Sequence, residues 1–223
     1  MRVEHIGNAT LILADCMDIM RDMPDKAFDL AIVDPPYGIG ETRLTQGAGK
    51  LKGRALQVLD AEFDDNPPSA EYFVELERVS KSRIIWGANY FSLPPTRGII
   101  CWDKCQPWPN FSQVEIAWTS FDTPAKLIRI DNRTGDKIHP TQKPVELYKW
   151  ILNTYAKPGD KILDTHGGSG SSVIACYDMG YPITWIEKDE DYFNQAYKRI
   201  EAAYQQPRLF DEPKPSCRQA VLL

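Results

Sequence analysis

The segment that decides the fold reads KILDTHGGSG and covers residues 161–170. An apolar run ends in Asp164, closely spaced glycines follow, and the helical pattern of residues 171–179 comes next. Glycine has no side chain, so a glycine-rich turn between a strand and a helix lets the backbone approach a ligand closely. The turn alone is a weak signal: it is compatible with a nicotinamide or flavin site and with a tight turn that binds nothing.

Strands and helices alternate along the rest of the chain. Short apolar runs predict strands at 10–14, 28–33, 83–86, 98–102, 114–119, 161–164 and 182–186. Helical spacing of apolar residues predicts helices at 16–23, 69–80, 144–155, 171–179 and 191–204. This alternation predicts a doubly wound α/β fold, in which helices cover both faces of a mostly parallel sheet.

The composition is that of an ordinary globular protein. The 223 residues are 43% hydrophobic and 11% aromatic, which fits one domain with a single core. Residues 1–204 are expected to form this domain, and the proline-rich residues 205–223 a flexible tail. No apolar run approaches the roughly 20 residues that span a bilayer, and the N-terminus lacks the pattern of a signal peptide. A soluble cytoplasmic protein is therefore expected.

The cysteines and the net charge argue against a disulfide-rich protein, a metal-binding protein and a uniformly basic protein. The five cysteines are scattered and odd in number, so neither a disulfide framework nor a metal site is expected. A net charge of −5 gives no basic field over the whole molecule. Two local basic patches are present: Arg43, Lys50, Lys52 and Arg54, and then Lys104, Lys126, Arg129, Arg133 and Lys137. Either patch alone is more simply interpreted as charge on a solvated surface.

The acidic residues near the glycine turn indicate which ligand fits there. Glu187 ends the next strand about 20 positions after Asp164, where a carboxylate can accept hydrogen bonds from ribose hydroxyls. The G-x-G-x-x-G fingerprint of a pyrophosphate site is absent, and the Asp164 carboxylate would repel a diphosphate. A carboxylate suits a positively charged ligand instead, and S-adenosylmethionine carries both a sulfonium and an ammonium.

A second motif, DPPY at residues 34–37, follows the strand predicted at 28–33. Its two prolines cannot continue a strand ladder, so the chain must turn there. Asp34 and the Pro35 carbonyl can accept hydrogen bonds from the amino group of a base, which would stabilise positive charge that develops on its nitrogen. Tyr37 offers a ring on which the base can stack. A rigid strand exit with a packed tyrosine explains the motif about equally well.

The two motifs together resemble those of the DNA amino-methyltransferases, which act on adenine N6 or cytosine N4. Asp34, Pro35, Pro36 and Tyr37 match the catalytic tetrapeptide, and the order of the motifs resembles the permuted beta arrangement of that family. The resemblance implies a Rossmann-like, seven-stranded, mostly parallel sheet and S-adenosylmethionine as cofactor. It also implies a set of cofactor-binding residues: Asp15, Cys16, Asp34, His139, Thr141, Lys143, Asp164, His166, Gly168, Ser169, Gly170 and Glu187.

The chain departs from the family pattern at Thr165-His166, where the family usually has Pro-Phe. The His166 ring is expected to fill the space of the phenylalanine rather than to act as a catalytic base. Asp34 at the head of the tetrapeptide favours adenine N6, because Ser there goes more often with cytosine N4. The alternatives are cytosine N4 methylation and a nucleic-acid-binding relative with a weakened cofactor site.

DNA is the expected partner, with the target base flipped out of the duplex. Residues 38–60 are expected to form a mobile loop that faces the DNA, and residues 121–137 a minimal target-recognition segment. A small recognition surface fits a homodimer. The segment QPRLF, residues 206–210, resembles peptides that bind bacterial sliding clamps, although its two apolar residues can also fold back on their own domain.

Overall fold

The computed structural model describes residues 1–39, 67–106, 112–132, 138 and 142–206. The strands are β1 (Arg2–Ile6), β2 (Ala9–Leu13), β3 (Phe28–Val33), β4 (Ser80–Trp86), β5 (Ile99–Asp103), β6 (Val114–Thr119), β7 (Lys126–Arg129), β8 (Ile162–Asp164) and β9 (Ile183–Glu187). The helices are α1 (Cys16–Asp22), α2 (Ala70–Val79), α3 (Val145–Tyr155), α4 (Ser171–Met179) and α5 (Glu190–Gln205). All of the predicted strands and helices are present, with ends shifted by a few residues at most.

One mixed sheet organises these elements, in the order β1-β2-β9-β8-β3-β4-β6-β5-β7. β1 runs antiparallel to β2, and β6 runs antiparallel to both β4 and β5. The remaining neighbours pair in parallel. The expected seven-stranded sheet is wrong in its count, because the described residues form nine strands, with β1 and β7 added at the two edges.

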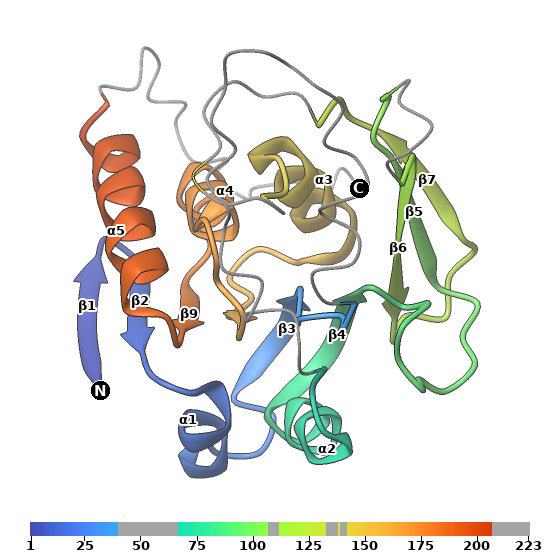
Figure 1. Ribbon diagram of the computed structural model, residues 1–223, viewed down its shortest axis with the longest axis horizontal. Helices are drawn as coiled ribbons and strands as arrows, with labels where there is room; N and C mark the ends of the chain where they lie inside the picture. The colour runs from blue at the N-terminus through green and yellow to red at the C-terminus, as the bar shows by residue number, and fades with distance from the viewer. Residues whose placement is uncertain (40–66, 107–111, 133–137, 139–141, 207–223) are drawn as a thin grey trace, which may run out of the picture.

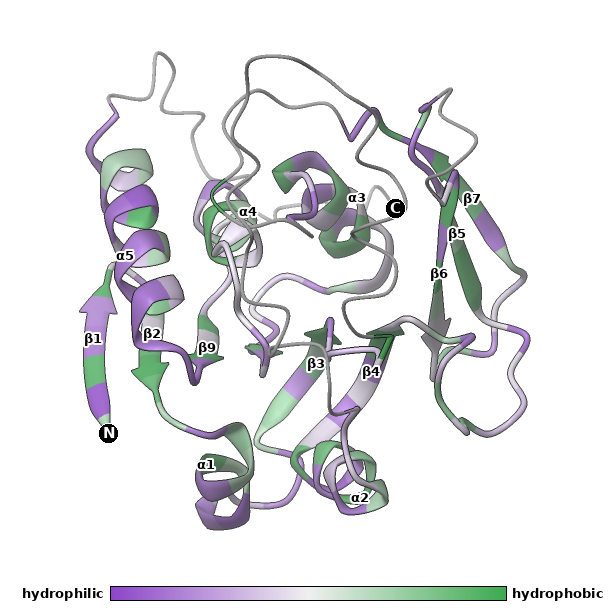
Figure 2. Ribbon diagram, viewed as in Figure 1, coloured by the Kyte–Doolittle hydropathy of each residue, from purple (hydrophilic) through white to green (hydrophobic). Residues whose placement is uncertain are grey.

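Helices cover both faces of the sheet, as the alternation of elements predicts (Figure 1). α3, α4 and α5 lie on one face, where their apolar side chains join those of the central strands in a large core cluster. α1 and α2 lie on the other face and close a second cluster around Met20, Tyr72 and Leu76. In Figure 2 the central strands are largely hydrophobic, whereas the helices carry polar residues between apolar ones. This is the pattern of helices that bury one side and of central strands that are buried on both faces.

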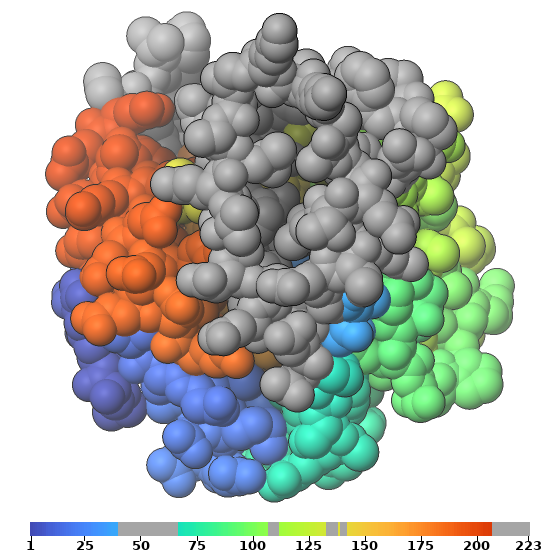
Figure 3. Space-filling view, viewed as in Figure 1, coloured from blue at the N-terminus to red at the C-terminus, as the bar shows by residue number. Residues whose placement is uncertain are grey.

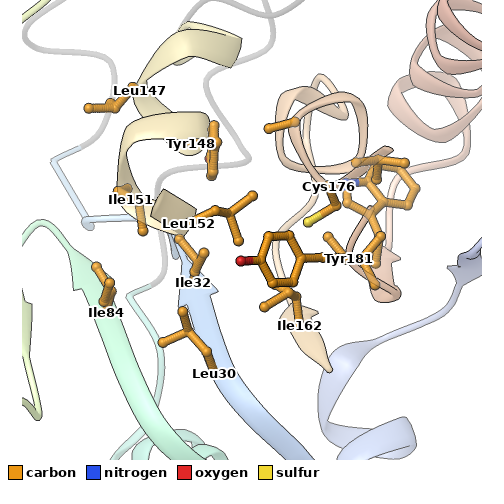
Figure 4. Close-up of a cluster of buried hydrophobic side chains, with 14 of the residues drawn as sticks. Leu30, Ile32, Ile84, Leu147, Tyr148, Ile151, Leu152, Ile162, Cys176 and Tyr181 are labelled. Atoms are coloured by element: carbon orange, nitrogen blue, oxygen red, sulfur yellow. The ribbon is translucent and has the colours of Figure 1, made fainter. Parts of the chain in front are cut away.

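The packing of α3 against the sheet illustrates the first cluster (Figure 4). Leu147, Ile151 and Leu152 are fully buried, and they recur at the spacing that places side chains on one helix face. All three belong to the same core cluster as Leu30 and Ile32 of β3, and in Figure 4 Ile151 and Leu152 lie on the side of α3 that faces β3. This contact fixes the start of α3, including the adjoining Lys143, above the carboxyl end of β3.

β1 and β7 form the two edges of the sheet, and the chain near them lies at opposite sides of the molecule (Figure 3). At one side Arg2 of β1 donates a hydrogen bond to Asn194 of α5 at 2.9 Å, and its guanidinium lies 5.0 Å from the ring centre of Phe193. At the other side β7 pairs with β5. Part of the expected target-recognition segment 121–137 is therefore sheet rather than irregular chain.

Ligand sites in doubly wound sheets lie where the chain reverses its direction of travel across the strands. Here α4 leads from β8 to β9, while α2 leads from β3 to β4, on the opposite face and in the opposite direction. The switch point therefore lies between β8 and β3, which are neighbours in parallel register. The carboxyl ends of these two strands carry Asp164 and Asp34.

Several predictions fall on residues outside the described ranges. They concern His139, Thr141, nearly all of the 38–60 loop and the 207–210 part of the clamp-like peptide. Among the helices that the structure describes, none is long and apolar enough to cross a membrane. No group of three or more histidine, cysteine or acidic side chains within the described ranges is arranged to hold a metal ion.

Candidate active site

The sequence-predicted residues meet at the carboxyl edge of the sheet. Asp34 follows β3, the turn 165–170 follows β8, Glu187 ends β9, and Asp15 follows β2. These four strands are consecutive neighbours and all run in parallel. Residues that lie up to about 170 positions apart in the sequence are therefore brought to one edge, around the switch point.

Asp34 is engaged through both carboxylate oxygens. The Tyr37 hydroxyl donates a hydrogen bond of 2.6 Å to Oδ1, and the Lys143 ammonium donates to Oδ2. Pro35 is buried and Pro36 is half-buried, so the turn that carries these groups is packed. Burial raises the pKa of the Asp34 carboxyl above its usual range, although the charge of Lys143 opposes this rise.

The Tyr37 ring is fixed on two sides. It stacks on Tyr90, with 4.8 Å between the ring centres and 15° between the planes, and Phe91 meets it edge-on at 6.1 Å. A Cβ added to Gly87, which has a φ of +75°, would lie 2.3 Å from a ring carbon of Tyr37. Gly87 therefore makes room for this ring, which explains a glycine directly after β4.

Lys143 is the centre of a buried ion-pair network that links two carboxylates. Its Nζ contacts Asp34 and lies 3.0 Å from Oε2 of Glu115, a residue of β6. Lys104 pairs with the same glutamate from the opposite side. Burial alone would lower the pKa of the Lys143 ammonium. The negative charges of Asp34 and Glu115 have the larger effect, so that this pKa is raised. Burial likewise opposes the charge of Glu115, yet Lys143 and Lys104 lower the pKa of its carboxyl.

Asp164 holds the glycine turn together from within. Its Oδ2 accepts a hydrogen bond of 2.6 Å from the Ser172 hydroxyl, and its Oδ1 accepts one of 3.2 Å from the His166 backbone N–H. Burial raises the pKa of this carboxyl to about 7, although both hydrogen bonds favour the charged form. The Asp164 side chain thus stabilises the turn and the first residues of α4.

Ser169 and Gly170 complete the turn. The Ser169 carbonyl accepts a hydrogen bond of 2.7 Å from Arg199 of α5, and its hydroxyl lies 3.2 Å from that of Ser171. Gly170 has a left-handed backbone, with φ of 73°, at the N-cap of α4. A side chain there would be strained, which is why glycine suits this position.

Glu187 and the start of α1 lie side by side beyond this turn. Glu187 accepts hydrogen bonds from the backbone N–H groups of Gly168 at 2.8 Å and of Asp189 at 2.9 Å. Its backbone carbonyl accepts from Ala14 at 3.0 Å, which brings Asp15 and Cys16 close. Asp15 caps α1 through the Met17 N–H, and burial raises the pKa of the Cys16 thiol to about 12, so that this thiol stays neutral.

This set of groups suits a nucleoside with a positively charged substituent. The Glu187 carboxylate is fixed by two backbone N–H groups, and each of its oxygens keeps a further lone pair for a ribose hydroxyl. The turn at Gly168, where φ is 50°, lets the backbone come close to a ligand. Asp34 and Glu187 would add negative charge beside a sulfonium or ammonium. S-adenosylmethionine therefore fits the residues that are present.

His166 packs as an uncharged ring. It meets Tyr72 edge-on with 5.2 Å between the ring centres, and its Nδ1 lies 3.0 Å from the Thr165 hydroxyl. The same hydroxyl forms a 2.7 Å hydrogen bond with Tyr72. Burial, together with the charge of Lys188, lowers the pKa of His166 from 6.5 to about 3. This arrangement supports the packing role that the sequence favours over a role as catalytic base.

Because folding depresses the pKa of His166, the His166→Phe variant should respond differently to acid. In the wild type, the unfolded chain binds a proton below pH 6.5 that the folded protein does not bind until about pH 3. The stability that this ring contributes is thus fully present above pH 6.5 and falls towards pH 3 by up to about 1.4 kcal/mol per pH unit. Urea unfolding should show that the free energy of unfolding of the variant, relative to that of the wild type, is higher at pH 5.0 than at pH 7.5. A stability difference that is equal at both pH values would contradict this assignment.

The site also contains residues that the sequence did not indicate. Two of them are Glu115, which contacts Lys143, and Tyr90, which stacks on Tyr37. Lys104 does not belong to a solvated surface patch, as its place in the sequence suggests, because its side chain is 11% exposed and paired with Glu115. Only contacts across strands, which no local pattern encodes, reveal these roles.

Comparisons with known proteins agree with this geometry. The profile of the DNA methylase family matches residues 108–198. Type II methyltransferase M.HinfI of Haemophilus influenzae is 27% identical over an alignment of 250 positions, which covers 86% of this chain and 68% of the relative. Type II methyltransferase M2.MboI of Moraxella bovis is 24% identical over 266 positions, which covers 96% of this chain and 94% of the relative.

Solved structures share the fold. The M1.HpyAVI–SAM complex superposes with a TM-score of 0.58 at 20% identity, covering 86% of this chain and 99% of that chain. The PvuII DNA methyltransferase (cytosine-N4-specific) superposes with a TM-score of 0.58 at 13% identity, covering 89% and 92%. The expected Rossmann-like α/β fold is thereby confirmed. Taken together, the family profile and the two relatives show that the chain is similar to DNA methylases, and the solved structures show that it has their fold.

Proposed function

We propose that this protein transfers a methyl group from S-adenosylmethionine to the exocyclic amino group of a flipped base in DNA, and that this group is adenine N6. The observation that carries the proposal is the position of Asp34. Its carboxylate follows β3 directly beside the glycine turn of β8, at the switch point of the sheet. A methyl donor held at the turn and a base held at Asp34 would thus be neighbours.

The chain's own residues provide orientation and charge stabilisation. The exocyclic nitrogen of a base is a poor nucleophile, because its lone pair is delocalised into the ring. An Asp34 oxygen and the Pro35 carbonyl that accept its two hydrogens would localise that lone pair and stabilise the positive charge that builds up. The ring of Tyr37, which stacks on Tyr90 and fits beside Gly87, would support the base plane.

S-adenosylmethionine, when bound, supplies a methyl carbon that bonds to the amino nitrogen as its bond to sulfur breaks and sulfur keeps the electron pair. The methylated nitrogen then carries a positive charge and releases one proton. Asp34 acts chiefly as a hydrogen-bond acceptor in this scheme. Glu187, the backbone at Gly168 and the start of α1 would hold the cofactor.

The test is transfer of a tritiated methyl group onto duplex DNA of mixed sequence, followed by digestion and nucleoside analysis. We expect the label in N6-methyladenine. Label in N4-methylcytosine would move the assignment to the alternative base and keep the reaction class. If the protein binds S-adenosylmethionine in calorimetry but labels no DNA in a panel of mixed sequences, the DNA substrate is wrong. If the protein binds no S-adenosylmethionine, it is instead a nucleic-acid-binding relative with a weakened cofactor site.

A further inference from the structure

The Lys143 ammonium occupies the place where the proposed function requires the target amino group. Its Nζ donates to Asp34 Oδ2 and lies 3.4 Å from the Tyr37 hydroxyl oxygen. The rings of Trp86 and Tyr37 flank it, with centres at 5.2 Å and 5.9 Å. A nitrogen that carries hydrogens, held by the catalytic carboxylate between aromatic faces, is what a flipped base would present.

Little room is left on Asp34 for a second donor. Its side chain is 18% exposed and that of Lys143 is 2% exposed, and Tyr37 already uses the other oxygen. An incoming amino group must therefore compete with the ammonium for Oδ2. A buried ammonium that left its carboxylate without another partner would pay a large desolvation cost.

Glu115 removes that obstacle. Its Oε2 lies 3.0 Å from the Lys143 Nζ, so the ammonium can give up Asp34 and keep a charged partner while it remains buried. Lys104 binds the same glutamate from the far side and holds it in place. The four side chains carry two positive and two negative charges, and the network remains neutral when Lys143 shifts between the carboxylates.

We infer that Glu115 is a positioning residue for methyl transfer, which receives the Lys143 ammonium when the amino group of the target base takes its place on Asp34. This inference rests on the proposed function. Glu115 touches neither the base nor the cofactor in this scheme. It acts through Lys143, by setting how readily the catalytic carboxylate becomes free to accept the substrate.

Glu115→Gln tests this role, because the amide keeps the size of the side chain and removes the charge. Lys143 should then remain on Asp34, and kcat should fall roughly 10-fold to 100-fold, the worth of one charge-assisted hydrogen bond. Binding of S-adenosylmethionine, measured by calorimetry, should be unchanged. Glu75→Gln is the matched control, because Glu75 is similarly buried in an ion pair, with Arg78 on α2, away from the site.

The pH dependence distinguishes this role from a structural one. Among the described residues, the titratable and charged groups near Asp34 are Lys143, Tyr37, Glu115, Asp164, Tyr72 and Tyr148. Removing the Glu115 charge should favour ionised Asp34 and move the acid limb of kcat/KM about one unit lower. Lys143→Met removes the positive neighbour instead and should move the limb higher, while Glu115 keeps Lys104 as its partner.

The proposal that Lys143 shifts from Asp34 to Glu115 would be supported by two results together: opposite shifts of the acid limb in the two variants, and a lowered kcat in Glu115→Gln. A folded Glu115→Gln protein with wild-type kcat and an unmoved acid limb would overturn it. A loss of kcat without any shift in either variant would also overturn it, because a merely structural glutamate predicts that result. Methyl transfer by the wild type is the common reference, and its absence would refute the proposed function rather than this step.

Discussion

Replacing Asp34 with alanine is expected to slow methyl transfer at least about 100-fold while cofactor binding remains measurable. The carboxylate is the only side-chain acceptor that the proposed mechanism places on the target amino group, and loss of one such electrostatic contact typically costs that much. The fold should survive, because Lys143 keeps Glu115 as a charged partner at 3.0 Å. The buried ammonium is thus not left unpaired.

The measurement is the single-turnover rate on duplex DNA, together with calorimetric titration of S-adenosylmethionine. Asp34→Asn serves as the matched variant, because it keeps the shape and one acceptor oxygen while it loses the charge. Its single-turnover rate should lie between those of the wild type and Asp34→Ala. Wild-type activity in the alanine variant would show that Asp34 is not the acceptor. Loss of cofactor binding together with activity would place its role in the binding of the donor.

The Gly167→Ala variant should lose about 3 kcal/mol of unfolding free energy and much of its affinity for the cofactor. The added Cβ would lie 1.9 Å from a ring carbon of Trp185, whose side chain is fully buried. The indole cannot move away without disturbing the core beneath α4 and α5. The turn would therefore shift, and with it Gly168 and the hydrogen bond that it donates to Glu187.

Chemical denaturation of Gly167→Ala, Trp185→Leu and the double variant separates this contact from other effects. If the clash is the cause, the double variant loses less than the sum of the two single losses. Gly159→Ala is the control for backbone strain, because φ there is +90° and nothing lies within 4 Å of the added carbon. It should cost only about 1 kcal/mol. Strict additivity in the cycle would refute the proposed contact.

The glycine at position 167 is required for a reason other than the approach of a ligand. The sequence assigns the glycines of residues 167–170 to close approach of a ligand. The structure supports a need for glycine at Gly170, where φ is positive, and shows that Gly167 makes space for an indole from the neighbouring strand. The position of Trp185 against the turn depends on the pairing of β8 with β9, which a local pattern does not contain.

Local sequence was sufficient for most of the fold. Apolar runs and helical spacing located the central strands and all five helices, because these elements bury their own residues with a regular period. The glycine turn and the DPPY motif located the two halves of the candidate site, since proline and glycine restrict or free the backbone wherever they occur. Two edge strands lack a clear apolar run: β1, whose residues alternate between half-buried and exposed, and the short strand β7.

Tertiary structure decided how the charged groups combine. Nothing near Glu115 or Lys104 in the sequence distinguishes them from surface charges, and Lys143 was expected beside the cofactor. Their pairing arises because β6 runs antiparallel to β4 and β5 and α3 packs over β3. Lys104, Glu115 and Lys143, from three distant segments, are thereby joined in one network that reaches Asp34 through Lys143. Secondary structure is encoded by neighbours along the chain, whereas the ion-pair network depends on strand order and register, which emerge only when the whole core is packed.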